Sequence, residues 1–413
     1  MLTVKAARET VLEHCCQFKS TQIPTEMVSL PRSQGRVLAE SICLDLDQPP
    51  FNRSMRDGFA VIAQDLSVLP AHLRCVGEIK AGESPAVRLQ SGEAIQIMTG
   101  APTPAGADAV VMVEHTKRIE SEEIIVHKSI KSGSNIAPKG SERQAGDLLI
   151  SKNTELGALE LGVLATVGKS QVRVFKRPSV SILTTGDELV DVAEQPGPGK
   201  IRNSNAYSLH AQVVRQGGDP QLLGPAEDNI EDLRHRIGLG LKSDLLLVSG
   251  GVSMGKYDLV ETVFEELGVQ VQFESVRMRP GKPTVFGKKD NKFVFGLPGN
   301  PVSTFVAFEL FVTPVLRVLQ GLSEDCHSLV KGKLKREIHE KSGRTAFLPA
   351  LVTCEAGCIE IEPLPWKGSA DIFSMVGANG LVVVPLESDE LLPSQEAHAL
   401  LFESMPSFSD CEF

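Results

Sequence analysis

A short apolar run leads directly into a glycine-rich loop in the segment Leu245–Asp258, LLLVSGGVSMGKYD. The run has no polar alternation, which is typical of a strand covered on both faces in a parallel sheet. Gly250, Gly251 and Gly255 then free the backbone, so that successive N–H groups can point at an anion, and the loop serines add hydroxyl donors. The segment predicts a buried strand followed either by a phosphate-binding loop or by a plain connection to a helix.

The surrounding segment, residues 178–326, alternates short apolar runs with amphipathic stretches. The expected elements are strands in VSILTTGDEL and QLLGPAEDN, a helix from Ser204 or Asn205 to Gly217 and Gly218, and a helix over Leu259–Leu267. Such alternation is typical of a doubly wound parallel sheet with right-handed crossovers. The sequence therefore predicts an α/β domain that binds its ligands outside the carboxyl ends of the strands.

Three acids follow the expected strands of this sheet. Glu188, Asp228 and Asp258 each lie just beyond an apolar run. Because the carboxyl ends of parallel strands meet at one edge, we expect these carboxylates to surround the glycine-rich loop. Carboxylates alone would repel a phosphate, so a bound Mg²⁺ is the natural inference.

Cations and a helix start follow in the motifs RMRPGKP and GLPGNPVSTF. Arg279 and Lys282 form a local positive patch beside a Pro-Gly turn, in a chain whose formal net charge is -10. Asn300 suits the N-cap and Pro301 the first position of a helix, so Ser303 is expected at a helix N-terminus, which attracts anions.

Composition excludes several classes of protein. The 413 residues predict about three domains, and the net charge argues against a nucleic-acid binder. We expect no membrane segment, because no apolar run reaches the roughly 18 residues of a membrane span. The N-terminus predicts an amphipathic helix capped by Thr3, with Val4, Ala7, Val11 and Phe18 near one face, rather than a signal peptide.

Cysteine usage points to a reducing compartment. The eight cysteines are scattered and form no CxxC motif, which favours free thiols in a cytoplasmic protein. Cys354 and Cys358 flank a short turn, but no second pair with ligand spacing accompanies them, so a shared metal is not expected.

The other segments are expected to be largely β-structured. PPFNRSMRDGFAVI presents Asp57 on a loop, IQIMTGAPT places Thr99 after a strand, and the C-terminal segment predicts a barrel or sandwich that carries Arg344 and Ser369. The predicted division is an N-terminal helix at 1–20 that packs on the α/β domain, a linker domain at 21–48 and 138–177, a small β-rich domain at 49–137, the α/β domain at 178–326 and a β domain at 327–413.

Six motifs occur in a specific order along the chain: SMRDGFA, TGAPTPAGADAVV, TGDEL, SGGVSMGKYD, PGKP and LPGNPVS. This set resembles the molybdopterin molybdenumtransferases, the MoeA family that includes the E domain of gephyrin. The resemblance implies an α/β multidomain fold with a MogA-like molybdopterin-binding domain. It also implies an enzyme that cleaves adenylylated molybdopterin with a divalent cation and inserts molybdate to give molybdenum cofactor and AMP.

The resemblance also implies site residues. The catalytic set would be Asp57, Thr99, Glu188, Asp228 and Asp258, of which Asp228 and Asp258 would hold Mg²⁺. The substrate-binding set would be Ser249, Gly250, Gly251, Ser253, Asn300 and Ser303. Molybdate would be gathered by Arg279, Lys282, Arg344 and Ser369.

Three positions depart from the family pattern. Arg279 stands where the family usually has Lys, Ala137 where it has Arg, and Glu142 where it has Asp. Arg279 keeps the charge with a different geometry, whereas Ala137 removes a cation.

The resemblance further implies a homodimer in which Asp57 and Thr99 complete the site of the partner. The implied partners are a MogA-type adenylyltransferase that supplies the substrate and proteins of molybdoenzyme maturation. Two alternatives remain open, a phosphoanhydride hydrolase resembling the CinA type and a molybdopterin-binding scaffold without catalysis.

Overall fold

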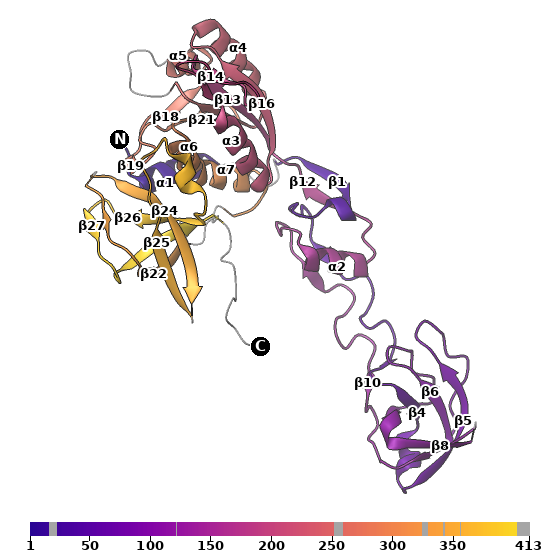
Figure 1. Ribbon diagram of the computed structural model, residues 1–413. Coiled ribbons are helices and arrows are strands. Elements are labelled where there is room, and N and C mark those ends of the chain that lie inside the picture. Colours follow the sequence, from indigo (N-terminus) through magenta and orange to yellow (C-terminus); the bar gives the residue numbers. More distant parts are fainter. Residues whose placement is uncertain are drawn as a thin grey trace.

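The computed structural model describes residues 1–15, 23–120, 122–251, 259–323, 329–341, 343–355 and 357–402. Phe18, Ser253, Gly255 and Asp258 lie outside the described residues. Figure 1 shows an elongated molecule: an α/β body and a β-barrel lie together at one end, a small β body lies at the other, and the segment that contains α2 (Ala158–Thr166) lies between them.

The α/β body is built on one six-stranded sheet. In spatial order its strands are β16 (Asp219–Ala226), β13 (Ser179–Thr185), β17 (Leu245–Ser249), β21 (Lys292–Leu297), β20 (Val285–Lys289) and β18 (Gln270–Phe273). The first four strands are parallel. β20 runs antiparallel to β21, and β18 runs antiparallel to β20, so β18 has the same direction as the first four. The predicted doubly wound parallel sheet is thus confirmed, with one strand of opposite direction, β20, next to the edge strand β18.

Helices cover both faces of this sheet. They are α3 (Ser204–Arg215), α4 (Ile230–Gly240), α5 (Leu259–Glu266), α6 (Pro301–Ala307) and α7 (Thr313–Val318). Leu245 and Leu247 of β17 pack into the cluster with α3, α6 and α7, whereas Leu246 and Val248 pack into the cluster with α4 and α5. Burial on both faces explains why the strand has no polar alternation.

The N-terminal helix α1 (Val4–Cys15) packs on the α/β body as predicted. The Thr3 hydroxyl accepts a hydrogen bond from the Ala6 N–H at 3.2 Å, so it caps the helix. Ala7 and Val11 are fully buried in the cluster with α6 and α7, and Val4 packs against the same cluster.

One helical stretch is apolar enough to resemble a membrane span. Over Pro301–Val318, α6 and α7 are joined by the π-helical turn η4 (Phe308–Val312), and the mean hydropathy is 1.4. The stretch meets the length and composition of a span, but 83% of it is buried inside the protein. Its composition is therefore that of a core helix.

The C-terminal segment forms a closed five-stranded barrel. Its strands are β24 (Thr345–Glu355), β25 (Cys358–Pro363), β22 (Leu329–Leu334), β28 (Glu396–Leu401) and β26 (Gly380–Val384), which pairs back with β24. A separate two-stranded antiparallel pair joins β23 (Ile338–His339) and β27 (Glu390–Leu391). The short strand β19 (Met278–Arg279), which precedes β20 in the chain, pairs in parallel with β24. This pairing ties the barrel to the α/β body.

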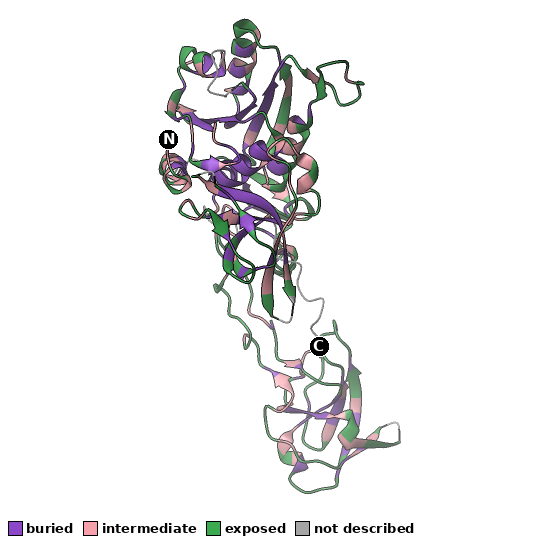
Figure 2. Cartoon of the chain, turned by 60° about the vertical axis from the view of Figure 1, so that its left-hand side comes forward, coloured by how far each residue is buried: buried purple, intermediate pink, exposed green. Residues whose placement is uncertain are grey.

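The small β body is a six-stranded sheet with its own core. Its spatial order is β7 (Ala109–Met112), β4 (Gly58–Val61), β6 (Glu93–Ile97), β5 (Ala71–Ile79), β9 (Glu123–Val126) and β8 (Thr116–Glu120). Figure 2 shows buried residues along these strands and in the α/β body, and mostly exposed or half-buried chain between them.

Short strand pairs build the connecting segment. The pairs are β1 (Thr25–Ser29) with β12 (Gln171–Phe175) and β2 (Ile42–Cys43) with β11 (Leu148–Ile150). A third pair, β3 (Arg53–Ser54) with β10 (Ile136–Ala137), lies beside the small β body, and Ile136 packs against the core of that body. Helix α2 begins at Ala158, with Gly157 as its N-cap.

Candidate active site

A cavity of about 1330 Å³ lies at the carboxyl edge of the parallel strands, where the α/β body meets the barrel. Its walls include most of the described residues that the sequence singled out: Glu188, Asp228, Ser249, Gly250, Gly251, Arg279, Lys282, Asn300, Ser303, Arg344 and Ser369. The strand-end rule correctly predicted this position, because the segments after β13, β16, β17 and β21 all contribute to it.

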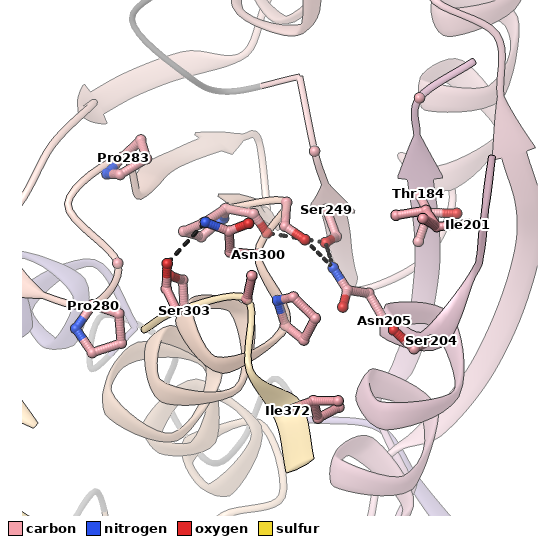
Figure 3. Close-up of a pocket in the computed structure, with 18 of the residues that line it drawn as sticks. Thr184, Ile201, Ser204, Asn205, Ser249, Pro280, Pro283, Asn300, Ser303 and Ile372 are labelled. Carbon is pink, nitrogen blue, oxygen red and sulfur yellow. Dashed lines mark hydrogen bonds between the residues drawn. The ribbon is translucent and has the colours of Figure 1, made fainter. Parts of the chain in front are cut away.

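Asn205, in the first turn of α3, links the end of β17 to the turn before α6. Its amide group donates to Ser249 Oγ at 2.9 Å and to the Gly299 carbonyl at 2.8 Å. Figure 3 shows this side chain directed toward Ser249. The strand end and the turn before α6 are therefore fixed relative to each other by one amide. The sequence indicated Asn205 only as a helix start, and Asn203 takes the N-cap position instead.

The loop after β17 requires glycine for reasons of space. A Cβ on Gly250 would lie 2.6 Å from the Thr185 carbonyl oxygen, and one on Gly251 would lie 2.8 Å from Val260. Both residues also have positive φ, 99° and 63°. The two glycines let this loop pack against the end of β13, where the buried Thr185 hydroxyl has no hydrogen-bond partner in the described part of the chain.

Two donors predicted for an anion are used inside the protein. The Gly250 N–H donates to the Leu297 carbonyl at 3.0 Å. The Ser249 hydroxyl donates to the Pro298 carbonyl at 3.2 Å and accepts from Asn205. The expectation that both groups point at a ligand is wrong, because the neighbouring strand β21 and the turn after it satisfy them. Both residues contribute shape to the cavity instead.

The acids at this edge interact with one another. The Asp228 N–H donates to Asp187 Oδ1 at 3.1 Å. Partial burial raises the pKa of Asp228, and the negative charges of Asp187 and Glu188 raise it further, which outweighs a hydrogen bond from the Asp187 backbone. The expected convergence of Glu188 and Asp228 is confirmed. A cation bound here would relieve this repulsion.

The described carboxylates do not complete a metal site. Within the described ranges, no group of three or more His, Cys, Asp or Glu side chains could hold an ion. Asp228 supplies the oxygen ligand that Mg²⁺ prefers, whereas the second expected ligand, Asp258, lies outside the described residues.

Cations also line the cavity. Arg279 Nη1 donates to Glu340 Oε1 at 2.6 Å, and its guanidinium carbon lies 5.8 Å from the centre of the Trp366 ring. Arg344 Nη1 donates to the Met278 carbonyl at 3.5 Å. Lys282 is half-buried and has no carboxylate partner among the residues described. The cavity is therefore lined by acids, Glu188 and Asp228 (the acidic wall), and by cations, Arg279, Lys282 and Arg344 (the basic wall).

The start of α6 is tied to the barrel side. Asn300 occupies the predicted N-cap position and Pro301 follows it, but the Asn300 side chain makes no capping bond. Its amide group donates to Ser369 Oγ at 2.8 Å, and the Val302 N–H donates to the Ser369 carbonyl at 3.0 Å. Ser303, the next residue, lines the cavity in the first turn of the helix.

Asp57 and Thr99 lie together but away from this cavity. The Thr99 N–H donates to Asp57 Oδ1 at 2.7 Å, and the Thr99 hydroxyl donates to the same oxygen at 3.0 Å. These bonds, the backbone one first, lower the pKa of Asp57. Both residues belong to the small β body, at the far end of the molecule in Figure 1, and neither lines the cavity. One chain does not unite the whole predicted catalytic set.

Three family models match successive parts of the chain. Residues 2–168 match the MoeA N-terminal region (domain I and II), residues 181–318 match a probable molybdopterin binding domain, and residues 331–402 match the MoeA C-terminal region (domain IV).

Relatives match over nearly the whole chain. A molybdopterin molybdenumtransferase of Bacillus subtilis is 35% identical, covering 91% of this chain and 89% of the relative, and one of Nostoc is 36% identical, covering 89% and 86%. The chain belongs to the MoeA family. A crystal structure of a MoeA protein from Pyrococcus horikosii has 33% identity and a TM-score of 0.82, covering 98% of this chain and 99% of that one.

Membership of the MoeA family confirms the expected enzyme class and the role in molybdenum cofactor biosynthesis. A hydrolase that shared only the α/β body would not account for the matches over residues 2–168 and 331–402.

In this MoeA chain a cation lies opposite Ala137 on the neighbouring strand. Ala137 of β10 pairs directly with Arg53 of β3. The Arg53 guanidinium donates to Glu142 at 2.5 Å. A cation and a carboxylate therefore still meet at this junction, and Glu142 has a partner that the sequence did not reveal.

The cysteine pair of the barrel does not form a metal site in this MoeA chain. In the ladder between β24 and β25, Cys354 pairs with Ile359 and Glu355 pairs with Cys358. Because neighbouring positions of a strand face opposite sides, the two thiols leave opposite faces of the hairpin. The expectation of unshared thiols agrees with this register.

Proposed function

We propose that this protein inserts molybdenum from molybdate into adenylylated molybdopterin and releases AMP, in a reaction that depends on Mg²⁺. The proposal rests on one observation: a single cavity is lined both by Glu188 and Asp228, the acidic wall, and by Arg279, Lys282 and Arg344, the basic wall. A phosphoanhydride with a metal ion suits the acidic wall, and a tetrahedral dianion suits the basic wall.

The residues of the acidic wall would act on the phosphoanhydride. Asp228, with Asp258, would hold Mg²⁺, which when bound supplies neutralisation of phosphate charge. The raised pKa of Asp228 supports this role, because a carboxylate crowded by other acids gains from a cation. Ser303 would offer its helix N-terminal position to an anionic part of the substrate.

The basic wall would gather molybdate. Arg279 and Arg344 carry planar donors that match an oxyanion, and Lys282 adds a charge without a carboxylate partner among the described residues. Ser369 is fixed by Asn300 and would contribute its hydroxyl at the edge of this group.

We further propose a homodimer in which the small β body of one subunit completes the cavity of the other. The Asp57–Thr99 pair is exposed and is flanked by the exposed apolar side chains of Met55, Met98 and Val113. A polar pair surrounded by exposed apolar side chains is typical of a protein–protein interface.

Helix α2 supplies a second argument for the dimer. Its sequence, ALELGVLAT, has Glu160 as its one charged residue, yet only Leu164 is buried, and Leu159 is 81% exposed. A helix with so few polar residues is normally covered by protein. Contact with a second copy of the connecting segment would cover it.

The substrate would come from an adenylyltransferase of the MogA type, and the product would pass to proteins that mature molybdoenzymes. We propose the cytoplasm as the location. Among the described residues, Cys43, Cys75, Cys354 and Cys358 are free thiols, which supports a reducing compartment.

The test is an assay of purified protein with adenylylated molybdopterin, Mg²⁺ and molybdate, which follows AMP release and cofactor formation. The proposal expects AMP release that requires Mg²⁺ and is coupled to molybdate. Release of AMP without cofactor formation would support the hydrolase, and absence of release would support a scaffold.

A further inference from the structure

Arg279 is held by two side chains of the barrel side of the cavity. Glu340 follows β23 and accepts from Arg279 Nη1 at 2.6 Å, and Trp366 places its ring 5.8 Å from the guanidinium carbon. Both residues come from a part of the chain at least 60 positions away. Neither was singled out in the sequence.

Glu340 is built into its position. Its side chain is only 5% exposed, and its backbone N–H donates to the Asp389 carbonyl at 2.8 Å. A buried carboxylate must keep a partner, because an unpaired charge in such a place is strongly unfavourable. One side of the Arg279 guanidinium is therefore held in an ion pair with a buried carboxylate.

The rest of the guanidinium is free to bind an anion. The Arg279 side chain is 42% exposed and lines the cavity. Its Nε and Nη2 groups make no hydrogen bond to any described residue. These two groups form one edge of the guanidinium, and two parallel N–H donors match two oxygens of an oxyanion.

We propose that Glu340 and Trp366 are positioning residues that orient Arg279, so that its Nε and Nη2 edge receives molybdate. This inference rests on the proposed placement of molybdate at the basic wall. A lysine at this position would be a mobile point charge. An arginine held by Glu340 and Trp366 presents a fixed pair of N–H donors.

The charge of Glu340 makes the inference testable by the sign of one effect. If Glu340 only neutralised Arg279, then Glu340→Gln would leave a more positive cavity and would strengthen the binding of a dianion. If Glu340 orients Arg279, the same substitution would release the guanidinium and weaken binding. The two roles predict opposite changes.

The experiment measures sodium molybdate binding by calorimetry at fixed ionic strength, with sulfate as the comparison anion. We expect Glu340→Gln to weaken molybdate binding by roughly tenfold, as for the loss of one charge-assisted contact. Glu390→Gln is the matched control, because it removes the same charge from an exposed position of β27, the strand that pairs with β23. It should bind molybdate like the unmodified protein.

Trp366 gives a second readout that does not depend on activity. It is the one tryptophan of the chain, so its fluorescence reports on the ring beside Arg279. Molybdate should change this fluorescence in the unmodified protein, and Arg279→Ala should abolish the change. Trp366→Phe should retain most of the binding measured by calorimetry, and Trp366→Ala should lose several-fold more.

Steady-state kinetics separate positioning from a loss of structure. Glu340→Gln should raise the KM for molybdate by roughly tenfold while kcat stays within about twofold, with an unchanged unfolding temperature. Equal or tighter molybdate binding by this variant would overturn the inference and leave the proposed function intact. If the unmodified protein bound molybdate no better than sulfate, the placement of molybdate itself would fail, and the inference with it.

Discussion

The N–H and the hydroxyl of Thr99 both donate to one oxygen of Asp57, over 2.7 and 3.0 Å. The two bonds fix an ionised carboxylate on an exposed face of the small β body, because they lower the pKa of Asp57. The pair is formed by neighbouring strands, since Gly58 of β4 pairs with Ile97 of β6. A fixed charge on an apolar rim, far from the cavity of its own chain, is the strongest reason to expect a shared site.

Mixing two inactive variants tests this shared site. Asp57→Ala and Asp228→Ala should each abolish AMP release, because each removes one half of a site. When the variants are unfolded together and refolded as mixed dimers, one site in half of the dimers is intact, so about a quarter of the activity should return. Failure of the mixture to regain activity, with mixed dimers shown by mass spectrometry, would place both halves in one chain.

The raised pKa of Asp228 predicts a dependence of stability on pH. The native pKa lies above the unfolded one, so the charged carboxylate costs stability at pH 7, and this cost disappears as the pH falls below the unfolded value near 4. Asp228→Asn should raise the unfolding temperature by about 1 °C at pH 7 and by less at pH 4.5, a small effect because the group is partly solvated.

Magnesium should reverse this order. Added Mg²⁺ should raise the unfolding temperature of the unmodified protein but not that of Asp228→Asn. Asp219→Asn, at the other end of β16, removes the same charge and should keep the response. An equal response to Mg²⁺ in all three proteins, measured by scanning calorimetry, would remove Asp228 from the metal site.

Gly250→Ala should destabilise the fold and close part of the cavity. The new methyl group would lie 2.6 Å from the Thr185 carbonyl oxygen, at a residue whose φ is 99°. We expect a loss of about 2 kcal/mol or more in the free energy of unfolding, measured by urea denaturation. Gly238→Ala in α4 is the control, because no atom lies within 4 Å of its added Cβ, and it should stabilise by up to about 1 kcal/mol.

Asn205→Asp should impair the cavity without unfolding the protein. The carboxylate has no N–H to donate to the Gly299 carbonyl and Ser249 Oγ, so the strand end and the turn before α6 would separate. We expect kcat/KM for the adenylylated substrate to fall roughly 10- to 100-fold. Tyr207→Phe, on an exposed side chain of the same helix, should be neutral. An unchanged kcat/KM in Asn205→Asp would show that this amide does not shape the site.

The parts of the fold that depend on local pattern were predictable. The unbroken apolar run of β17 indicates burial on two faces. Thr3 and Asn300 mark helix starts, because the residue preferences of the N-cap position depend only on neighbouring residues of the chain. The position of Glu188 and Asp228 at one edge of the sheet was also predictable, because the strand-end rule needs only the order and direction of the strands.

Contacts between distant segments were not predictable. The Gly250 N–H is used by Leu297 because β21 lies beside β17, and no spacing in the sequence indicates that. The position of Arg53 opposite Ala137 depends on the pairing of β3 with β10. In both cases the deciding partner is more than 40 residues away.

The sequence by itself determined the α/β body, the β-structured remainder and the residues that could carry phosphate and oxyanion chemistry, because periodicity, glycine and helix-start signals are local. Tertiary structure alone decided which groups remain available to a ligand. In the folded chain Ser249 accepts a hydrogen bond from Asn205, and Arg279 contacts both Glu340 and Trp366. Asp57 accepts hydrogen bonds from Thr99 at the far end of the molecule. A polar group bonds whichever partner the packed chain brings within reach, and that is a property of the whole fold.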